Sequence, residues 1–399
     1  MIPYGTGAYW RITLALCLGS FLVFSCLYTT QPLMPILAKQ FAVSELAASF
    51  SLTISTFALG LSLLIYGPLS DALGRRGLIV ASIAGLFVTT LALSQVSTYP
   101  QLLALRAVQG FFIAGLPAIA VAYMADEFTP EALMHSVAIY IAANTLGGIG
   151  GRLMAGFIGE YLGWQQAFFA MGLLGVLVWC ILLVALPKSL HFRPQSLQPH
   201  RILADLKTHL SNRLLLPAYI LGGLNFLVFV NQFSFLTFVL ESAPYHLSAK
   251  FLGMLFLVYL TGTAASALSG KLGNGFGQAN CMLLGSALVI VGTLVTLLAP
   301  LPFIILGLLI NSFGFFLAHS SASSWVSRNA THGKATASSL YLVFYYVGAS
   351  VGGSYLNIFW QWQQWRGVVA GSISLLLVTC AMAVMLRGQQ SLRATVAVP

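Results

Sequence analysis

Twelve long apolar runs constrain the fold of this chain more than any other feature of its sequence. Each run contains about 20 predominantly apolar residues, the length that an α-helix needs to cross the hydrocarbon core of a bilayer. Of the 399 residues, 58% are hydrophobic and 7% are charged, whereas about 25% of the residues in soluble domains are charged. The sequence therefore predicts an all-α polytopic membrane protein with spans at 11–37, 46–69, 77–96, 100–125, 133–158, 165–186, 214–240, 248–270, 279–298, 301–325, 335–358 and 365–386.

The longest polar interruption, at 187–213, divides the twelve spans into two sets of six. Within it Ile202, Leu206 and Leu210 recur at every fourth position, so we expect a short amphipathic helix at the membrane surface. The predicted organisation is an N-terminal six-helix bundle at 1–186, a basic cytoplasmic linker at 187–213 and a C-terminal six-helix bundle at 214–399.

The distribution of positive charge predicts the orientation in the membrane. If the amino terminus lies in the cytoplasm, most of the 18 lysine and arginine residues fall on the cytoplasmic side, and only Lys39, Lys250 and Arg366 fall outside. Cytoplasmic loops of membrane proteins carry such an excess of positive charge, so both termini are predicted to be cytoplasmic. The first run is too long for a signal peptide and contains Pro32 and Pro35, so it is predicted to be a retained helix.

Several functional classes are excluded by the composition and the motifs. The net charge of +10 does not indicate a nucleic-acid partner, because the basic residues are dispersed between apolar spans. The five cysteines lie inside apolar runs without metal-ligand spacing, so neither disulfides nor a metal site is predicted. No nucleotide-binding motif and no nucleophile paired with a base occur at membrane depth, so we predict no enzyme, no cofactor and no ATP drive.

The two halves of the chain resemble each other at an offset of about 200 residues, as expected for an internal duplication. The second copy has lost its charges, because Asn274 stands at the position of Asp71 and Gln278 at that of Arg75. Two pseudo-symmetric bundles are therefore expected. The aligned anchors are Gly67, Asp71 and Gly74 with Gly270, Asn274 and Gly277, 110–114 with 314–318, Gly147 and Gly151 with Gly348 and Gly352, and Trp164 with Trp365.

A polar turn at 67–79 joins the second and third runs. Gly67 and Gly74 lack side chains, which suits a turn or the close approach of a neighbouring helix. Asp71 supplies an anion, and Arg75 and Arg76 supply cations. An ordinary positive cytoplasmic loop would explain the arginines but not the glycines or the aspartate.

This turn resembles the signature loop between helices two and three of the major facilitator superfamily, G-x-L-x-D-x-x-G-R-[RK]. The resemblance extends over essentially the whole chain and implies a twelve-helix drug or metabolite exporter that works by alternating access. We expect the loop to act as a gate, in which Asp71 docks at the amino end of the eleventh helix near Thr336 when the cytoplasmic side is closed. The motif positions that match are Gly67, Leu69, Asp71, Gly74, Arg75 and Arg76.

Arg106 lies in the middle of the fourth run, with Gln109 on the same helical face. A guanidinium at membrane depth costs about 2.5 to 3.5 kcal/mol on insertion scales, so it is a candidate functional group. The sequence around it resembles the R-x-x-Q-G element of the superfamily, which implies proton transfer or recognition of substrate charge. The alternative is an arginine that only donates hydrogen bonds to the carbonyls of neighbouring helices.

The glycine-rich fifth run carries a second arginine, Arg152. Its glycines permit close helix packing, which alone explains the row of Gly147, Gly151, Ala155 and Gly159. Antiporters of the superfamily usually have Gly-Pro where this chain has Gly151 and Arg152, and this departure resembles the YnfM-like branch. The adjacent row, which aims Arg152 along the same interface, contains Asn144, Gly148, Arg152, Gly156 and Glu160.

The resemblance implies that helices one, four, seven and ten line the transport path. His319 could act as a proton switch, although a neutral histidine that is hydrogen-bonded inside the bundle is at least as consistent with the sequence. Asp126, Glu127 and Glu160 are the other nearest candidates for proton binding. The predicted cavity residues are Tyr28, Arg106, Gln109, Arg152, Asn225, Gln232, Asn311 and His319.

All eight acidic residues fall at span ends or in loops, which favours a neutral or anionic solute over a cation. We expect a monomeric secondary transporter of the cell inner membrane that moves a small organic solute, with proton-linked efflux by antiport as the family default. The alternative is uptake or export of an anionic, carboxylate-rich metabolite such as a siderophore. A membrane sensor or channel would not need duplicated halves with a charged gate loop.

Overall fold

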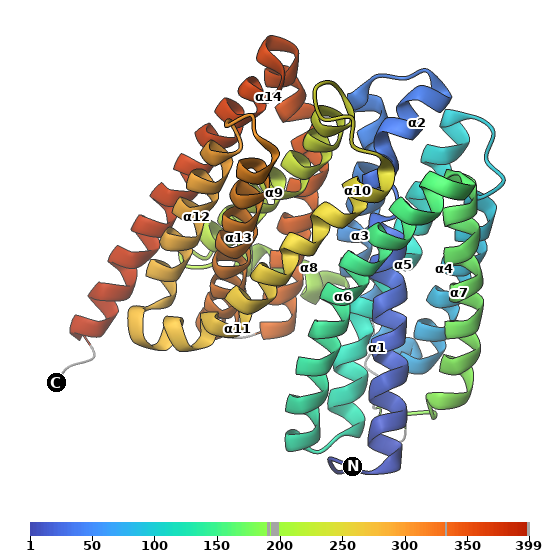
Figure 1. Ribbon diagram of the computed structural model, residues 1–399. Coiled ribbons are helices and arrows are strands. Elements are labelled where there is room, and N and C mark those ends of the chain that lie inside the picture. The colour runs from blue at the N-terminus through green and yellow to red at the C-terminus, as the bar shows by residue number, and fades with distance from the viewer. Residues whose placement is uncertain (190–191, 193–198, 332, 397–399) are drawn as a thin grey trace. The chain divides into compact units, whose positions relative to one another are not determined.

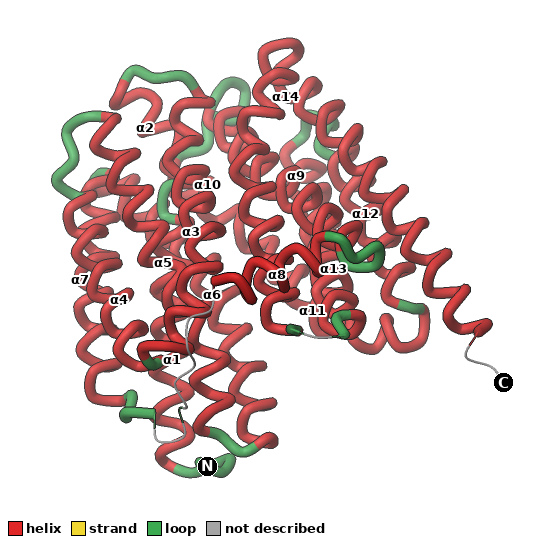
Figure 2. Tube along the Cα trace, turned by 180° about the vertical axis from the view of Figure 1, so that it is seen from behind, coloured by secondary structure: helices red, strands yellow, loops and turns green. Residues whose placement is uncertain are grey.

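The computed structural model describes residues 1–189, 192, 199–331 and 333–396, and this part of the chain is helical apart from its short connections and one isolated bridge between Ile2 and Phe128. Eleven of its helices are long and apolar enough to cross a membrane. The last of these is two helices, because Gln363 and Gln364 have non-helical backbone angles inside α14. The predicted all-α polytopic fold with twelve spans is thereby confirmed (Figures 1 and 2).

The helices follow the predicted runs to within four residues, except that the helices of the eighth and twelfth spans end later than predicted, at Phe276 and Val396. Two of the spans contain short 3₁₀ segments (η). The first half contains α1 (Gly7–Tyr28), η1 (Gln31–Leu33), α2 (Met34–Phe41), α3 (Glu45–Leu73), α4 (Arg75–Leu93), α5 (Tyr99–Glu127), α6 (Pro130–Leu162) and α7 (Trp164–Ala185). The second half contains α8 (Pro199–Leu210), α9 (Leu216–Glu241), α10 (Ala249–Met254), η2 (Leu255–Val258), α11 (Tyr259–Phe276), α12 (Gln278–Val295), α13 (Leu301–Asn329) and α14 (Lys334–Val396).

The chain forms two compact units. Unit 1 consists of Met1–Leu197 and Leu240–Phe256, and unit 2 consists of Gln198–Val239 and Leu257–Pro399. Unit 1 therefore contains α1 to α7 and also the short helix α10, which packs against α6 and η1. The remaining helices, α8, most of α9 and α11 to α14, belong to unit 2.

Glycines allow α1 and α6 to pack with their backbones in contact in unit 1. A Cβ atom on Gly147 would lie 2.4 Å from the carbonyl oxygen of Phe21, and one on Gly151 would lie 2.3 Å from Cα of Ser25. Both distances are far shorter than a real Cβ contact. The packing explanation for this glycine row is therefore confirmed.

The same arrangement recurs in unit 2 between α9 and α14. A Cβ atom on Gly348 would lie 2.2 Å from the carbonyl oxygen of Gly223, and one on Gly352 would lie 2.8 Å from that of Leu227. These positions are the repeat partners of the glycines on α6, so the internal repeat preserves a packing mode as well as a sequence pattern.

Residues with positive φ mark the repeated turns. Gly74 (φ 99°) and Gly277 (φ 88°) end α3 and α11 at corresponding positions, and Gly163 (φ 92°) separates α6 from α7. The repeat partner of Gly163 is Gln364, which adopts φ 45° without being glycine. A left-handed backbone is therefore required at this turn in both halves.

The helix α8 lies where a short helix was predicted within the linker. Of its predicted apolar face, Leu206 packs against the hydrophobic core of unit 2 that contains Leu215, Tyr219 and Trp325. Leu210, which was predicted on the same face, is exposed, as is Leu203. The linker residues 190–191 and 193–198, including the basic Arg193, lie outside the described residues.

Candidate functional site

The predicted gate loop is built around Arg75, the first residue of α4. Its Nη1 atom donates to Oδ1 of Asp71 at 2.6 Å, and its Nε atom donates to Oδ2 of Asp126 at 2.7 Å. Asp71 lies near the end of α3 and Asp126 near the end of α5, so one guanidinium joins three helices. The Arg75 side chain is only 12% exposed, which favours strong charge-assisted hydrogen bonds.

Arg76 donates hydrogen bonds to backbone carbonyls, whereas Arg75 donates to carboxylates. Its Nε atom donates to the carbonyl oxygen of Leu186 at 2.5 Å, and its Nη2 atom donates to that of Leu183 at 2.8 Å. These carbonyls belong to the carboxyl end of α7, where unsatisfied oxygens and the helix dipole favour a cation. Arg76 therefore fastens α4 to α7.

The two glycines of the loop differ in their surroundings. Gly74 has φ 99° and ends α3, as expected of a turn residue. Gly67, in contrast, lies inside α3, and apart from its chain neighbours and the backbone of its own helix no described atom lies within 4 Å of the position that a Cβ would take. The role of Gly67 in the gate stays a prediction.

Arg106 is fully buried and donates to backbone carbonyls of two other helices. Its guanidinium reaches the oxygens of Ser51 on α3 (2.6 Å) and of Cys26 and Leu27 on α1 (3.0 and 2.7 Å). The carbonyls of α1 lie in its last turn, at the negative end of the helix dipole. These contacts match the alternative interpretation of Arg106, in which the arginine satisfies neighbouring carbonyls.

Gln109 extends this network to a fourth helix. It accepts a hydrogen bond from Nη1 of Arg106, and its Nε2 atom donates to Oγ1 of Thr90 on α4 at 2.7 Å. The structure therefore brings Arg106 and Gln109 together, as their spacing predicted. Thr90 was not predicted, because a single threonine inside an apolar run gives no distinct signal.

Arg152 is 1% exposed and lies between two aromatic rings. Its guanidinium carbon is 3.8 Å from the ring centroid of Tyr28 and 4.3 Å from that of Phe256. Its Nε atom donates to Oε1 of Gln31 at 2.8 Å, and its Nη1 atom donates to the carbonyl oxygen of Gly148 at 2.7 Å. Cation–π contacts of this kind stabilise a desolvated guanidinium.

The Arg152 centre joins residues that are far apart in the sequence. Tyr28 was predicted as a cavity residue, and the structure places it against the guanidinium. Gln31 and Phe256 were not predicted, since no periodicity connects them to α6. Their contribution depends on how η1 and the segment 240–256 pack against α6 in unit 1.

In unit 2, Gln232, Thr293 and Asn311 form a buried hydrogen-bond triangle. Nε2 of Gln232 donates to Oγ1 of Thr293 at 3.0 Å, and Nδ2 of Asn311 donates to Oε1 of Gln232 at 2.9 Å and to Oγ1 of Thr293 at 3.1 Å. Thr293 was missed by the sequence analysis, although it is the repeat partner of Thr90. Each unit therefore has a polar contact centred on this threonine position.

Asn225 lies two turns from Gln232 on α9 and donates to Oγ of Ser286 at 3.3 Å. Within the described residues, the Oδ1 atoms of Asn225 and Asn311 are buried without a hydrogen-bond partner. A buried acceptor without a partner costs about 1 to 3 kcal/mol. The polar residues on α9 and α13 therefore keep two unpaired acceptor oxygens among the described groups.

His319 is two turns from Asn311 on α13, but it belongs to an aromatic cluster. Its Nδ1 atom lies 2.9 Å from the hydroxyl oxygen of Tyr341, and its ring centroid lies 4.7 Å from that of Tyr345. The ring of Phe315 is nearly parallel to that of His319, with centroids 5.9 Å apart. These aromatic partners were not predicted, because phenylalanine and tyrosine are common in apolar spans and give no distinct signal.

The described residues contain no group of three or more histidine, cysteine, aspartate or glutamate side chains that could hold a metal ion. The predicted site residues thus form four separate centres. Unit 1 holds the gate loop, the Arg106 network and the Arg152 centre. Unit 2 holds the polar triangle with the neighbouring His319 cluster.

Comparisons with known proteins agree with this architecture. The sequence model of the Major Facilitator Superfamily matches residues 16–353. The uncharacterized MFS-type transporter YybF of Bacillus subtilis is 37% identical over 377 residues, which cover 94% of this chain and 93% of that protein. The inner membrane transport protein YnfM of Escherichia coli is 35% identical over 377 residues, which cover 94% of this chain and 90% of that protein.

A solved structure shows the same fold. The crystal structure of the nucleoside transporter NupG superposes with a TM-score of 0.75 at 15% sequence identity, and the match covers 94% of this chain and 99% of that one. Together, the matched family model, the two relatives and the shared fold confirm the resemblance seen in the loop motif. The chain is a member of the major facilitator superfamily.

Proposed function

We propose that this chain is a proton-linked secondary transporter that exports small organic solutes across a cell inner membrane and prefers anions to cations. Membership of the superfamily supports the transport of a solute through the bilayer. The preference for anions, the direction and the coupling to protons are our proposals, as are a monomeric state and cytoplasmic termini.

The proposed preference for an anion is based on the buried guanidinium of Arg152. It lies in the last third of α6, and the groups that contact it include two ring faces and two uncharged oxygens. An anionic solute that approached this centre would meet a donor able to form charge-assisted hydrogen bonds. A cationic solute would be repelled, and this repulsion is strong because burial lowers the local dielectric.

The gate loop supplies the conformational step of this proposal. Arg75 holds both Asp71 and Asp126 at one end of unit 1. In the proposed cycle, Asp71 also docks near Thr336, at the amino end of the helix that begins at Lys334, when the cytoplasmic side is closed. Helix amino ends favour anions by about 0.3 to 1 kcal/mol. Release of this contact would bias the protein toward the inward-open state.

Transport by purified protein in liposomes tests the proposal directly. Liposomes with imposed pH and voltage gradients would be loaded either with a polycarboxylate such as citrate or with a cationic dye. We expect proton-dependent movement of the anion and loss of this movement in Arg152→Gln. Movement of a cationic dye at an equal rate in the wild type and in Arg152→Gln would contradict the anion preference.

Uptake of a carboxylate-rich metabolite such as a siderophore is the second candidate, and the same arginine favours it. The two candidates differ only in the direction of net flux under a physiological proton gradient. Moving one charge across 100 mV is worth about 2.3 kcal/mol, so the voltage dependence of the flux also reports the charge carried. Export against the solute gradient supports the first candidate, and accumulation supports the second.

A further inference from the structure

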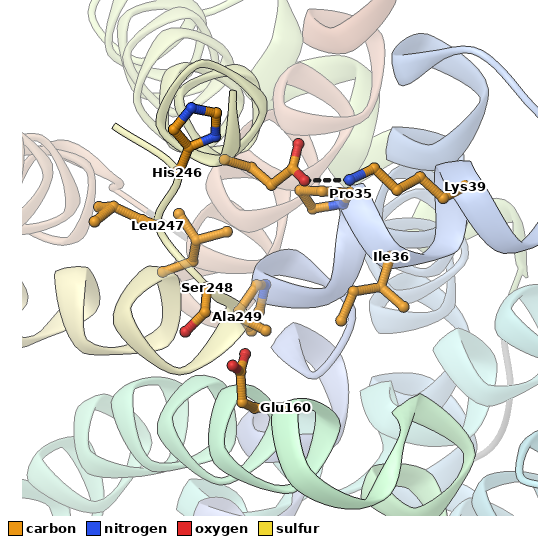
Figure 3. Close-up of a pocket in the computed structure, with 11 residues that line it drawn as sticks. Pro35, Ile36, Lys39, Glu160, His246, Leu247, Ser248 and Ala249 are labelled. Atoms are coloured by element: carbon orange, nitrogen blue, oxygen red, sulfur yellow. Dashed lines mark hydrogen bonds and ion pairs between the residues drawn. The ribbon is translucent and has the colours of Figure 1, made fainter. Parts of the chain in front are cut away.

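Unit 1 contains a cavity at the end of its helices that is remote from the gate loop. Its volume is about 280 Å³. It lies where the segment after α1, the end of α6 and the segment 240–256 meet (Figure 3). None of the residues of the Arg106 and Arg152 centres lines it, so it is separate from the solute site proposed above.

The cavity is lined by more acidic than basic side chains. Glu160 and Glu241 supply two carboxylates, whereas Lys39 supplies one ammonium group. Lys39 forms an ion pair with Glu241, and its side chain is 71% exposed. Glu160 points from α6 toward Ala249 in Figure 3, and the ion pairs found among the described residues do not include it. With His246, which also lines the cavity, counted as neutral, Glu160 leaves the cavity with an excess of negative charge.

The other walls of the cavity are mainly apolar. Pro32, Pro35 and Ile36 form one side, and Leu247 and Leu252 contribute to the other. Prolines have little conformational freedom, so the first wall is fixed before any ligand binds. An apolar cavity with a few convergent polar groups is the usual form of a small-molecule site.

Close backbone packing joins two of the segments that line the cavity, α6 and α10. The position of a Cβ on Gly156 is 2.5 Å from the carbonyl oxygen of Ala249, and that of a Cβ on Gly253 is 2.7 Å from the carbonyl oxygen of Arg152. These contacts fix α10 against α6, which carries Glu160. The backbone that carries Glu160 and the apolar wall is therefore preorganised, which reduces the entropic cost of binding, although the Glu160 side chain itself is exposed.

We propose that this cavity binds a small organic cation, such as a primary alkylammonium. Its ammonium group would pair with the carboxylate of Glu160, and its alkyl chain would lie against Pro35, Ile36 and Leu252. Lys39 competes with the ligand, because it repels the ammonium group and engages Glu241. This site goes beyond the proposed transport of anions, which depends on Arg152.

Binding can be measured on the full-length protein in lipid nanodiscs without knowledge of the transported solute. The probe is butylammonium, compared with butyrate and butanol, which have alkyl chains of similar size but carry an anionic or a neutral head group. We expect saturable binding of butylammonium alone, in saturation-transfer NMR titrations and as a rise in the thermal unfolding midpoint at constant ionic strength. A ligand this small would bind with a dissociation constant on the order of millimolar.

Two variants and a matched control locate the site. Glu160→Gln should weaken butylammonium binding by about tenfold, because a charge-assisted hydrogen bond is lost. Glu131→Gln, which removes an exposed carboxylate from the first turn of the same helix, should leave binding unchanged. Lys39→Gln should tighten binding by about threefold to tenfold, because a competing cation is removed.

The outcomes distinguish this site from the proposed function. Equal responses to butylammonium and butanol, or unchanged binding in Glu160→Gln with a normal unfolding midpoint, would overturn the cation site. Neither result would affect the transport assay with Arg152→Gln. Conversely, a failure to transport anions would leave the binding result intact, since the probe and the variants are different.

Discussion

Arg75 is the side chain on which the gate loop depends, because it binds a carboxylate from each of two other helices. We predict that Asp71→Asn abolishes transport while the protein still inserts and folds. The substituted amide would keep the shape of the side chain but lose the charge that the proposed docking near Thr336 requires. Liposome flux measures the effect, and the amount of monodisperse purified protein reports folding.

Asp126→Asn provides a comparison at the same guanidinium. It should lower the free energy of unfolding by about 1 kcal/mol, since Arg75 keeps its hydrogen bond to Asp71. Glu131→Gln is the control, because its carboxylate is exposed and lies at the same end of unit 1. Full transport activity in Asp71→Asn would exclude the gate as proposed.

The role of Arg106 can be separated from solute recognition by exchanging it for lysine. Arg106→Lys keeps the positive charge but cannot reach the carbonyls of Ser51, Cys26 and Leu27 together. We expect the free energy of unfolding to fall by about 2 to 4 kcal/mol, as when buried hydrogen-bonding groups lose their partners. Thermal unfolding with Arg11→Lys, an exposed position, as the control would measure this loss.

The flux assay completes the test of Arg106. If Arg106 only stabilises the bundle, Arg106→Lys retains transport at temperatures at which it stays folded. Loss of transport by a folded Arg106→Lys protein would instead support a direct role in the transport path. A variant as stable as the wild type would contradict the importance of the carbonyl contacts.

At the level of helices, the contact between α1 and α6 depends on the absence of side chains. Gly151→Ala should lower the free energy of unfolding by about 3 kcal/mol or more, because its Cβ would overlap backbone atoms of Ser25. Gly67→Ala is the contrasting case, because it adds a methyl group inside α3 where, apart from the chain neighbours and the backbone of the helix itself, no described atom lies within 4 Å. That change should be neutral or stabilising by up to about 1 kcal/mol.

These two glycines can be compared by thermal unfolding in the same detergent. If Gly67→Ala keeps the stability but loses transport, the glycine of the loop motif serves the transport cycle. Equal destabilisation by both substitutions would mean that the helix contacts described for α6 do not determine the stability of unit 1.

At the turn within α14, we predict a substitution that increases stability. Gln364 adopts φ 45° and ψ −127°, a region in which non-glycine residues are strained. Gln364→Gly should raise the free energy of unfolding by about 1 kcal/mol, because its repeat partner Gly163 makes the same kind of turn without this strain. Gln363→Gly, at φ −146°, is the matched control and should give no such gain in the unfolding midpoint.

For the molecule as a whole, the apolar runs predicted the spans and the repeat, because hydrophobic length and self-similarity are local properties of a sequence. The loop motif likewise predicted Asp71 and Arg75 as the charged groups of the gate loop, since both are defined positions of the motif. The sequence did not predict Asp126, Gln31 or Phe256 as partners of the arginines. These contacts arise from tertiary packing, and nothing in the spacing of the residues records them.

The segment Leu240–Phe256 shows most clearly how tertiary packing departs from the order of the sequence. It follows the seventh span along the chain, but it packs with unit 1. Hydropathy assigned these residues to the second half, because they adjoin its helices along the chain. The contacts of Gly253 with Arg152 and of Ala249 with Gly156 explain their actual position. Such backbone contacts are specified by glycine on two distant helices, a pattern that cannot be recognised in one sequence.

This packing has a consequence for any attempt to express the halves separately. The polypeptide passes from one unit to the other after Leu197, after Val239 and again after Phe256. A fragment that stopped at the linker would lack Phe256 and α10, leaving Arg152 with one aromatic neighbour fewer and Gly156 of α6 without its backbone contact to Ala249. The N-terminal fragment would therefore be incompletely packed when it is expressed alone. Co-expression with the C-terminal fragment would restore the missing contacts.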